Sequence, residues 1–363
     1  MPASVETTRS PVGMPVGVPV PADEFPHALP DAAVELPYKD TWMLCFHDVP
    51  AEVTVLVHLT LSANRLPGLR ATVGVRHGRR RLQETVYETP LISTGDAGGT
   101  ASLGCDLVRV DILEPAWTPA KHLRLTVRHR VDDEDVELVA DFRGRYFGVD
   151  SSVLTPGLIP SGEGIQQLGH AEQACTVTGR LRWGPDDIEI AAGNGYRDRS
   201  WGFRKSDKMA VHGYAFAQAH LPEATCGLLS WRHPDAQSSA ALPVGAWLAD
   251  AQGVYAATDG LLHLSPTGRG HRLALSFSDG RSIDLTTRSV LSELHYPYHE
   301  PEMSGPAIGT LCWDQHLAFD SAQGPCVGLL NIGTPFVADV LRDSTFCVAG
   351  GGGISVAGPG TTR

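Results

Sequence analysis

The chain has 363 residues, of which 42% are hydrophobic and 19% are charged, a composition that excludes an intrinsically disordered protein and indicates a sizeable core. The formal net charge of −12, from 41 acidic and 29 basic residues, excludes nucleic acid as the main partner, because phosphate binding needs clustered basic side chains. No apolar run is long enough to span a bilayer, and the first residues lack the pattern of a secretory signal.

The two ends of the chain carry few signals for regular structure. Residues 1–37 are rich in Pro, Val, Ala and Gly, which excludes a regular helix. We expect this part to be either a disordered tail or an extended segment lying across a domain surface. Residues 350–363 begin with four glycines and are expected to form a Gly-rich tail.

Between the ends, the hydrophobic pattern is that of β-strands. Apolar and polar residues alternate with a period of two, which places the apolar side chains on one face. The alternating runs are 53–61, 107–112, 123–127, 136–140, 175–181, 188–190, 273–277 and 283–285. Asp279 and Gly280 lie between the last two runs and predict a hairpin turn. Helical periodicity is nearly absent, and only residues 285–296 suggest one short helix.

A cluster of Pro and Gly at 155–162 predicts a break between two domains. We expect an N-terminal β domain over 38–165 and a C-terminal β domain over 166–349. Many short antiparallel strands with turn signals favour sandwiches or closed barrels, which leave no unpaired sheet edges. The predicted fold class is therefore all-β, with two tandem domains. A barrel of eight to ten strands has room for one small apolar ligand.

The segment 193–204, GNGYRDRSWGFR, differs from the rest of the chain in its charged and aromatic residues. Alternation along a strand places Tyr196, Asp198 and Ser200 on one face, and leaves the arginines at 197 and 199 on the other. An Asp paired with an arginine stays ionised, whereas an Asp facing an apolar cavity has a raised pKa and holds a proton at neutral pH. A purely structural role, in which a buried ion pair and a packed indole lock a barrel corner, explains the same residues.

The same segment resembles the GxGxRDHSWGxR element of the AttH-like proteins, which are related to carotenoid 1,2-hydratase (hydroxyneurosporene synthase). The stretches 167–173, 179–181 and 311–314 also fit the layout of that family. The resemblance covers about residues 40–340 and implies two tandem lipocalin-like β domains, with the ligand site near their junction. It further implies activities such as hydration of isoprenoid double bonds or cyclisation of polyenes.

The resemblance also implies roles for single residues. Tyr196 and Asp198 match the catalytic pair of the hydratase, in which the Asp is the proposed proton donor, and Trp201 matches a shared Trp that we take as substrate-binding. Arg199 stands where His is usual in AttH-like proteins. The sequence His-Ala-Glu at 170–172 stands where the hydratase has His-x-Trp, so the exact reaction does not follow from the resemblance.

Other polar and aromatic residues are further candidates for substrate binding. His212 and Tyr214 follow the motif and point the same way along a strand. Tyr296 lies in the HYPYH sequence at 295–299. The full set of these candidates is His170, His212, Tyr214, Tyr296 and Trp313. If Asp198 does not supply the proton, His170, Glu172 and His212 are the next candidates.

The sequence predicts no metal and no cofactor. The seven cysteines are scattered without a CxxC pair, which is typical of reduced, buried thiols in a cytoplasmic protein. The HxxxH spacing of His295 and His299 suits a metal only on a helix, and Pro297 disfavours a helix there. No cofactor-binding motif is present.

Two functions from different classes fit these observations. The first is an isomerase- or lyase-type enzyme, a cofactor-independent, acid-catalysed cyclase or hydratase of a hydrophobic isoprenoid or polyene. In that reading Asp198 protonates an alkene and aromatic side chains stabilise the cation. The second is a non-catalytic carrier of a lipid or pigment. In both, the partner is a hydrophobic small molecule, which a transient contact with a membrane surface would help to collect. The sequence determines neither the substrate nor the oligomeric state.

Overall fold

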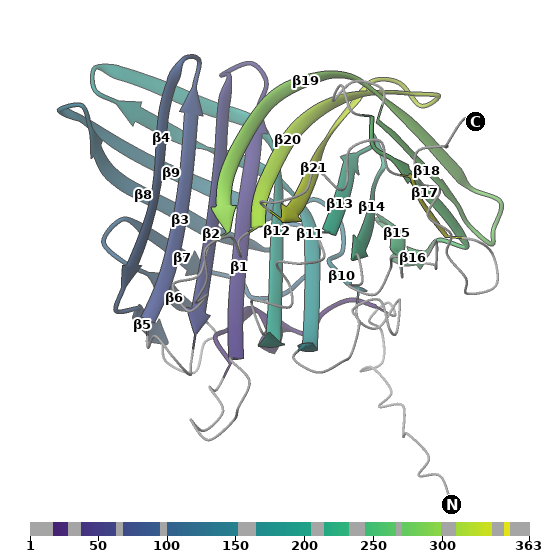
Figure 1. Cartoon of the computed structure of the whole chain (residues 1–363), viewed down its shortest axis with the longest axis horizontal. Helices are drawn as coiled ribbons and strands as arrows, with labels where there is room; N and C mark the ends of the chain where they lie inside the picture. The colour runs from purple at the N-terminus through teal and green to yellow at the C-terminus, as the bar shows by residue number, and fades with distance from the viewer. Residues whose placement is uncertain are drawn as a thin grey trace, which may run out of the picture.

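The computed structural model describes residues 17–27, 38–62, 68–94, 100–151, 165–204, 214–231, 244–265, 271–298, 310–335 and 345–348. Its regular structure consists almost entirely of antiparallel strands in two curled sheets, which lie next to each other in Figure 1. The only helical element with both ends among these residues is a four-residue 3-10 helix, η1, at Pro21–Glu24. The all-β architecture expected from the sequence is therefore confirmed.

The first sheet has twelve strands, which follow the order β4-β3-β2-β1-β12-β11-β9-β8-β7-β6-β5, with β10 paired to β11. Its strands are β1 (Tyr38–Asp48), β2 (Val53–Ser62), β3 (Gly68–His77), β4 (Arg80–Glu88), β5 (Leu91–Thr94), β6 (Ala101–Gly104), β7 (Val108–Ile112), β8 (His122–Val131), β9 (Glu134–Gly144), β10 (Val149–Asp150), β11 (Ile165–Trp183) and β12 (Asp186–Arg204).

The second sheet has ten strands in the order β16-β15-β14-β13-β21-β20-β19-β18-β17-β22. They are β13 (Tyr214–His220), β14 (Ala224–Trp231), β15 (Val244–Asp250), β16 (Val254–Ala256), β17 (Asp259–His263), β18 (Arg272–Ser276), β19 (Ser282–Tyr298), β20 (Thr310–Ser321), β21 (Cys326–Pro335) and β22 (Thr345–Val348).

The local expectations from the sequence mostly agree with these strands. Each alternating run falls within a strand or overlaps one, and Asp279 and Gly280 form the turn between β18 and β19, with Gly280 at φ +87°. The helix expected at 285–296 is wrong. These residues belong to β19, which pairs with β18 on one side and β20 on the other, so that ladder hydrogen bonds override a weak local preference.

The chain changes sheet between Arg204 and Tyr214. The division predicted at residues 165 and 166 therefore does not coincide with the division between the sheets. The reason is the long hairpin of β11 and β12, because β11 pairs with β9 and β12 pairs with β1, which places both strands in the middle of the first sheet. The breaker cluster at 155–162 precedes this hairpin and lies outside the described residues.

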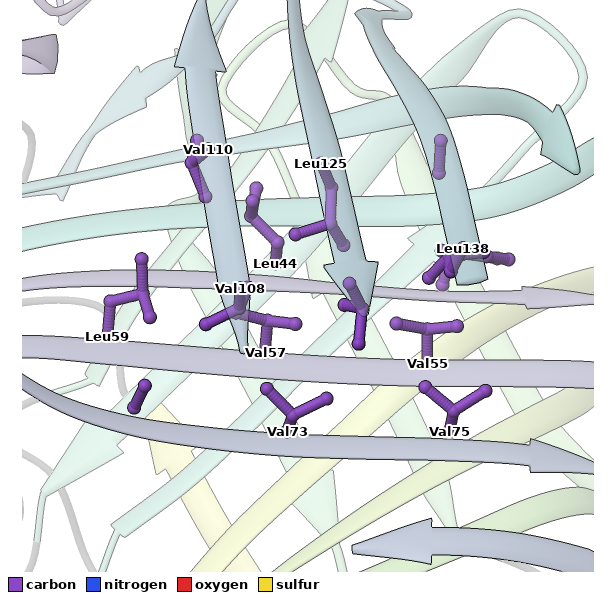
Figure 2. Close-up of a cluster of buried hydrophobic side chains, with 14 of the residues drawn as sticks. Leu44, Val55, Val57, Leu59, Val73, Val75, Val108, Val110, Leu125 and Leu138 are labelled. Atoms are coloured by element: carbon purple, nitrogen blue, oxygen red, sulfur yellow. The ribbon is translucent and has the colours of Figure 1, made fainter. Parts of the chain in front are cut away.

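Each sheet curls around its own apolar core. In the first sheet, Val55, Val57, Val73 and Val75 from β2 and β3 face residues from β7, β8 and β9, such as Leu125 (Figure 2). The core of the second sheet is built in the same way from small and branched side chains of β13 to β21. These cores come from the alternating runs, since one face of each strand must leave water.

A third apolar cluster joins the two sheets, and we call its location the junction. It combines Met43 and Tyr196 of the first sheet with Phe216, Leu294 and Leu329 of the second, among others. Because β1 contributes Leu44 to the first core and Met43 to the junction, both faces of this strand are buried, and all eleven of its residues are buried. In Figure 1, β19, β20 and β21 arch from the second sheet toward β1 and β12.

The described part of the N-terminal segment, residues 17–27, is held against the face of β12 opposite the junction. Arg197 binds the buried Glu24 at 3.2 Å, and Arg199 binds Asp40 and the carbonyl oxygen of Phe25. Both guanidinium groups also lie over indole rings, Arg197 over that of Trp117 at 4.0 Å. Residues 17–27, which include η1, thus lie against the first sheet.

Two further findings concern membranes and thiols. Within the described ranges, no helix has the length and apolar character needed to cross a bilayer. Six of the seven cysteines fall in these ranges with described side chains, and all six are buried and form no disulfide with one another.

We expect Asp40→Asn to lower the free energy of unfolding by about 3–5 kcal/mol, because it leaves the buried Arg199 without its counterion. Burial alone would raise the pKa of Asp40, but the charge of Arg199 and the hydrogen bonds to it lower that pKa. The stabilisation is therefore present above the unfolded pKa of about 4 and lost as the pH falls through the lower folded value.

Asp284→Asn breaks an exposed pair with Arg272 and serves as the matched control. It should lower the free energy of unfolding by about 0–1 kcal/mol, as measured for both variants by urea denaturation. Equal losses in both variants would contradict this prediction.

Candidate active site

Four polar side chains meet on the junction face of the β11–β12 hairpin. Glu172 on β11 is the register partner of Asp198 on β12, and the period of two adds His170 and Tyr196 to the same face. Tyr196 belongs to the apolar cluster of the junction. These four residues, which we call the acid cluster, therefore lie at the edge of the contact between the sheets, as the family resemblance implied for the ligand site.

The acid cluster is connected by short contacts. His170 Nε2 lies 2.5 Å from Asp198 Oδ2 and 3.5 Å from Glu172 Oε1, and the Tyr196 hydroxyl donates to Asp198 Oδ2 at 3.4 Å. Ser151 Oγ donates to the carbonyl oxygen of His170 and so accepts from Nδ1 of the same residue at 3.2 Å. Nε2 and Oδ2 therefore share one proton, which either group can carry.

Glu172 is the least solvated member of the acid cluster. Its side chain is fully buried, and neither carboxyl oxygen makes a hydrogen bond of standard geometry within the described part of the chain. Its neighbour across the ladder to β10 is the apolar Val149. Burial raises the pKa of Glu172 well above its usual range, and the nearby Asp198 raises it further. The raised pKa favours the neutral carboxylic acid of Glu172, which is the state of a proton donor.

Solvent reaches the acid cluster through Asp198. The Asp198 side chain is 15% exposed, whereas that of His170 is 7% exposed and that of Glu172 is inaccessible. A proton can thus pass from solvent to the His170–Asp198 pair, which in turn contacts the buried acid. Burial also raises the pKa of Tyr196 well above its usual value, so its phenol stays protonated.

Aromatic rings continue from the acid cluster into the second sheet. The Tyr196 ring lies 4.8 Å from that of Phe216, and the Phe216 ring lies 6.1 Å from that of Trp247. Ring faces of this kind attract a positive charge by about 0.5–2 kcal/mol each. The arrangement therefore combines a proton donor with groups that stabilise a carbocation.

The acid cluster also contains potential metal ligands. One ligand atom each from His170, Glu172 and Asp198 lies within 4.8 Å of the others. One nitrogen and two carboxylate oxygens are a donor set that divalent cations accept. A metal would need Glu172 as a carboxylate, however, and its burial favours the neutral acid.

The remaining site residues expected from the sequence are distributed differently. Trp201 points to the face opposite the acid cluster, where its ring stacks on His27 at a centroid distance of 4.4 Å, so its role here is in packing. Tyr296 is buried in the junction, on the second sheet. Tyr214 begins β13 and Trp313 lies in β20, but the side chains of both fall outside the described set. His212 lies outside the described residues altogether.

Asp314 is a second buried acid that the sequence reasoning left out of the site. It lies in β20, and Asn331 Nδ2 donates to its Oδ1, while its Oδ2 has no hydrogen-bond partner within the described ranges. It lies near Cys45 of the first sheet. Burial raises the pKa of the Cys45 thiol most, and the charge of Asp314 raises it further. Burial raises the pKa of Asp314 itself to about 7. In the sequence, Asp314 ends the stretch 311–314 that fits the layout of the AttH-like family, but no site role was expected for it.

We expect Asp314→Asn to change how stability depends on pH. Because the folded pKa is raised from 3.8 to about 7, the free energy of unfolding of the native chain should fall as the pH rises from about 4 to about 7, by at most about 4 kcal/mol. Asp314→Asn should remove this contribution to the slope and leave that of Glu172, whose pKa is also raised, as measured by urea denaturation at several pH values. The exposed Asp320 on the same strand provides the control Asp320→Asn, which should keep it. Parallel curves for the native chain and Asp314→Asn would show that Asp314 is ionised throughout.

Solved structures share the fold of this chain at low sequence identity. CghA, in its structure with Sch210972, is 12% identical with a TM-score of 0.57, over 89% of this chain and 95% of CghA. A putative AttH from Nitrosomonas europaea is 13% identical with a TM-score of 0.48, over 82% of this chain and 92% of that protein. Kievitone hydratase from Nectria haematococca is 12% identical with a TM-score of 0.45, over 87% and 92%.

CghA shares the fold of this chain at a TM-score of 0.57, and the expected tandem lipocalin-like fold is confirmed. No curated protein matches the chain. The family model described as Domain of unknown function (DUF7064) matches residues 20–319, and the chain therefore belongs to that family.

Proposed function

We propose that the protein is a cofactor-independent, acid-catalysed cyclase or hydratase of a hydrophobic isoprenoid or polyene, acting at the junction. The observation that carries this proposal is the fully buried carboxyl group of Glu172, whose burial raises its pKa, set beside Tyr196 and the His170–Asp198 pair. Burying a carboxyl group without a counterion destabilises the fold, so its presence is explained best by a use for the proton that it keeps.

The proposed reaction begins with proton transfer from the Glu172 carboxylic acid to a carbon of the alkene. The resulting cation is stabilised by the ring faces of Tyr196 and Phe216. Water then captures the cation in a hydratase, or an internal nucleophile or second alkene does so in a cyclase. The His170–Asp198 pair contacts both solvent and Glu172, and it returns a proton to the carboxylate.

This proposal moves the proton donor from Asp198, as the family resemblance implied, to Glu172. Asp198 shares a proton with His170 at 2.5 Å and is open to solvent, which suits a relay. Glu172 lies 3.5 Å from the same His170 nitrogen, without a hydrogen bond of standard geometry among the described residues, and burial raises its pKa well above its usual range. The two arginines of the motif whose side chains are described, Arg197 and Arg199, bind Glu24 and Asp40 on the opposite face and pair with neither group. The scaffold role considered for the motif therefore fits the arginines and Trp201.

The fold comparison supports a small-molecule substrate. CghA shares the fold, and its structure contains Sch210972. We propose that this chain likewise takes a small hydrophobic molecule. A carrier without catalysis is the competing function, and it predicts a bound compound of unchanged mass and unchanged hydrogen content.

We expect Glu172→Gln to lower turnover by about two to four decades, the usual contribution of a general acid, while the chain stays folded. Turnover is measured by mass spectrometry after incubation with linear polyprenyl alcohols and prenylated phenols. A gain of one water indicates hydration, and an isomer of unchanged mass indicates cyclisation. Glu189→Gln, at an exposed position on β12, is the matched control and should leave turnover unchanged.

A comparison with Asp198→Asn decides which carboxyl group gives the proton. If Asp198 is the relay, Asp198→Asn keeps a first turnover and slows later ones, whereas Glu172→Gln abolishes the first turnover as well. The opposite order would return the donor role to Asp198. A Glu172→Gln protein that works at full rate, with an unchanged melting temperature, would refute acid catalysis by this residue.

We expect activity to persist after treatment with a strong chelator, because a neutral Glu172 is a poor metal ligand. The measurement is turnover before and after dialysis against the chelator, with and without added Mg2+ or Zn2+. Activity that is lost in the chelator and restored by one of these ions would instead assign His170, Glu172 and Asp198 to a metal centre.

A further inference from the structure

A narrow polar cavity lies in the junction next to the acid cluster. Along β12, Asp198 lies on one side of Tyr196 and Asn194 on the other, and the cavity is at the Asn194 side. Its walls come from β1, β12, β13, β19, β20 and β21, and therefore from both sheets. Its volume of about 10 Å3 is near the smallest that holds one water molecule.

Three histidines line this cavity, and their hydrogen bonds differ. His47 Nδ1 contacts Thr54 Oγ1 at 3.0 Å. His220 Nδ1 lies 3.3 Å from an Arg145 nitrogen, and because arginine only donates, this Nδ1 is an acceptor. His316 Nε2 is buried and has no hydrogen-bond partner within the described residues. An enclosed nitrogen without a partner beside a water-sized space is what a bound water would satisfy.

All three imidazoles are neutral at pH 7. Burial lowers the pKa of His220 to about 3 and that of His316 well below its usual value, and it also lowers the pKa of His47. A neutral imidazole can accept a proton. His316 is a weak base, but a weak base is sufficient for the oxonium ion that forms when water captures a carbocation, since this ion is a strong acid.

We infer that the reaction is a hydration, and that the cavity beside Tyr196 holds the water that it consumes, with His316 as the base that takes the proton of this water. The inference rests on the proposed function, because it needs the cation that Glu172 generates. Tyr196 borders both the cavity and the acid cluster, so the acid and the water lie on either side of one side chain.

The step balances without a further reagent. The π electrons of the alkene form a C–H bond with the Glu172 proton and leave a carboxylate. A lone pair of the water oxygen forms the C–O bond, and one water proton passes to the His316 nitrogen. The imidazolium proton returns to the carboxylate through solvent and the His170–Asp198 pair. The net change is the addition of one water to one double bond, with no oxidation or reduction.

The test compares His316→Phe with the native chain on the same polyprenyl alcohols and prenylated phenols in D2O. Deuterium entering recovered or isomerised alkene reports proton transfer, and a gain of one D2O reports water capture. We expect His316→Phe to lower water capture by about 10²–10⁴-fold and to change deuterium entry by less than about threefold. His316→Gln, which keeps a polar side chain but lacks the base, should also lose water capture. His271→Phe removes a buried histidine of the same sheet, away from the cavity, and should keep the product ratio.

A crystal structure of the native chain provides an independent measurement, in which we expect one ordered water within hydrogen-bond distance of His316 Nε2. An empty cavity, or native-like water capture in both His316 variants, would overturn the inference. Isomers of unchanged mass as the only products would overturn it as well, while leaving acid catalysis intact. If the native chain shows neither deuterium entry nor any product, the proposed function itself is refuted, and this inference with it.

Discussion

Burial of β1, and of the part of β12 that pairs with it, on both faces is the constraint on which the rest of this structure depends. One face of β1 belongs to the core of the first sheet and the other to the junction with the second. A polar side chain in this region is therefore largely removed from water whichever way it points. Such a group must find a partner of opposite charge, find a hydrogen bond, or give up its charge.

The two faces of β12 meet this constraint in different ways. Arg197 and Arg199 keep their charges because distant segments supply Glu24 and Asp40. On the junction face, no arginine or lysine with a described side chain reaches Glu172, and burial raises the pKa of this carboxyl group well above its usual range instead. A matched ion pair stabilises the position of a segment but has little reactivity, whereas an unmatched acid retains a proton that it can transfer. The residues with a structural role thus lie on one face of the β11–β12 hairpin, and the residues with a proposed catalytic role lie on the other.

The fold follows from the sequence to a large extent, because alternation predicts strands wherever one face is apolar. The division between the sheets does not follow from it. A Pro- and Gly-rich cluster predicts a boundary between domains, but strand pairing decides which sheet a strand joins. β11 pairs with β9, which precedes it in the sequence. The helix expected at 285–296 fails for the same reason, because β18 and β20 provide ladder hydrogen bonds that no local pattern reveals.

For the site, the sequence by itself determined which side chains share a face. Tyr196 and Asp198 are two residues apart, as are His170 and Glu172, and the strand period brings each pair to one side. Only the tertiary structure decided which of these groups is left without a counterion. The acidic residues Glu24, Asp40 and Asp314, which the fold brings near β11 and β12, are distant from these strands in sequence. The charge state of a buried group depends on every charge and dipole around it, and those neighbours are set by sheet pairing and by the contact between the sheets.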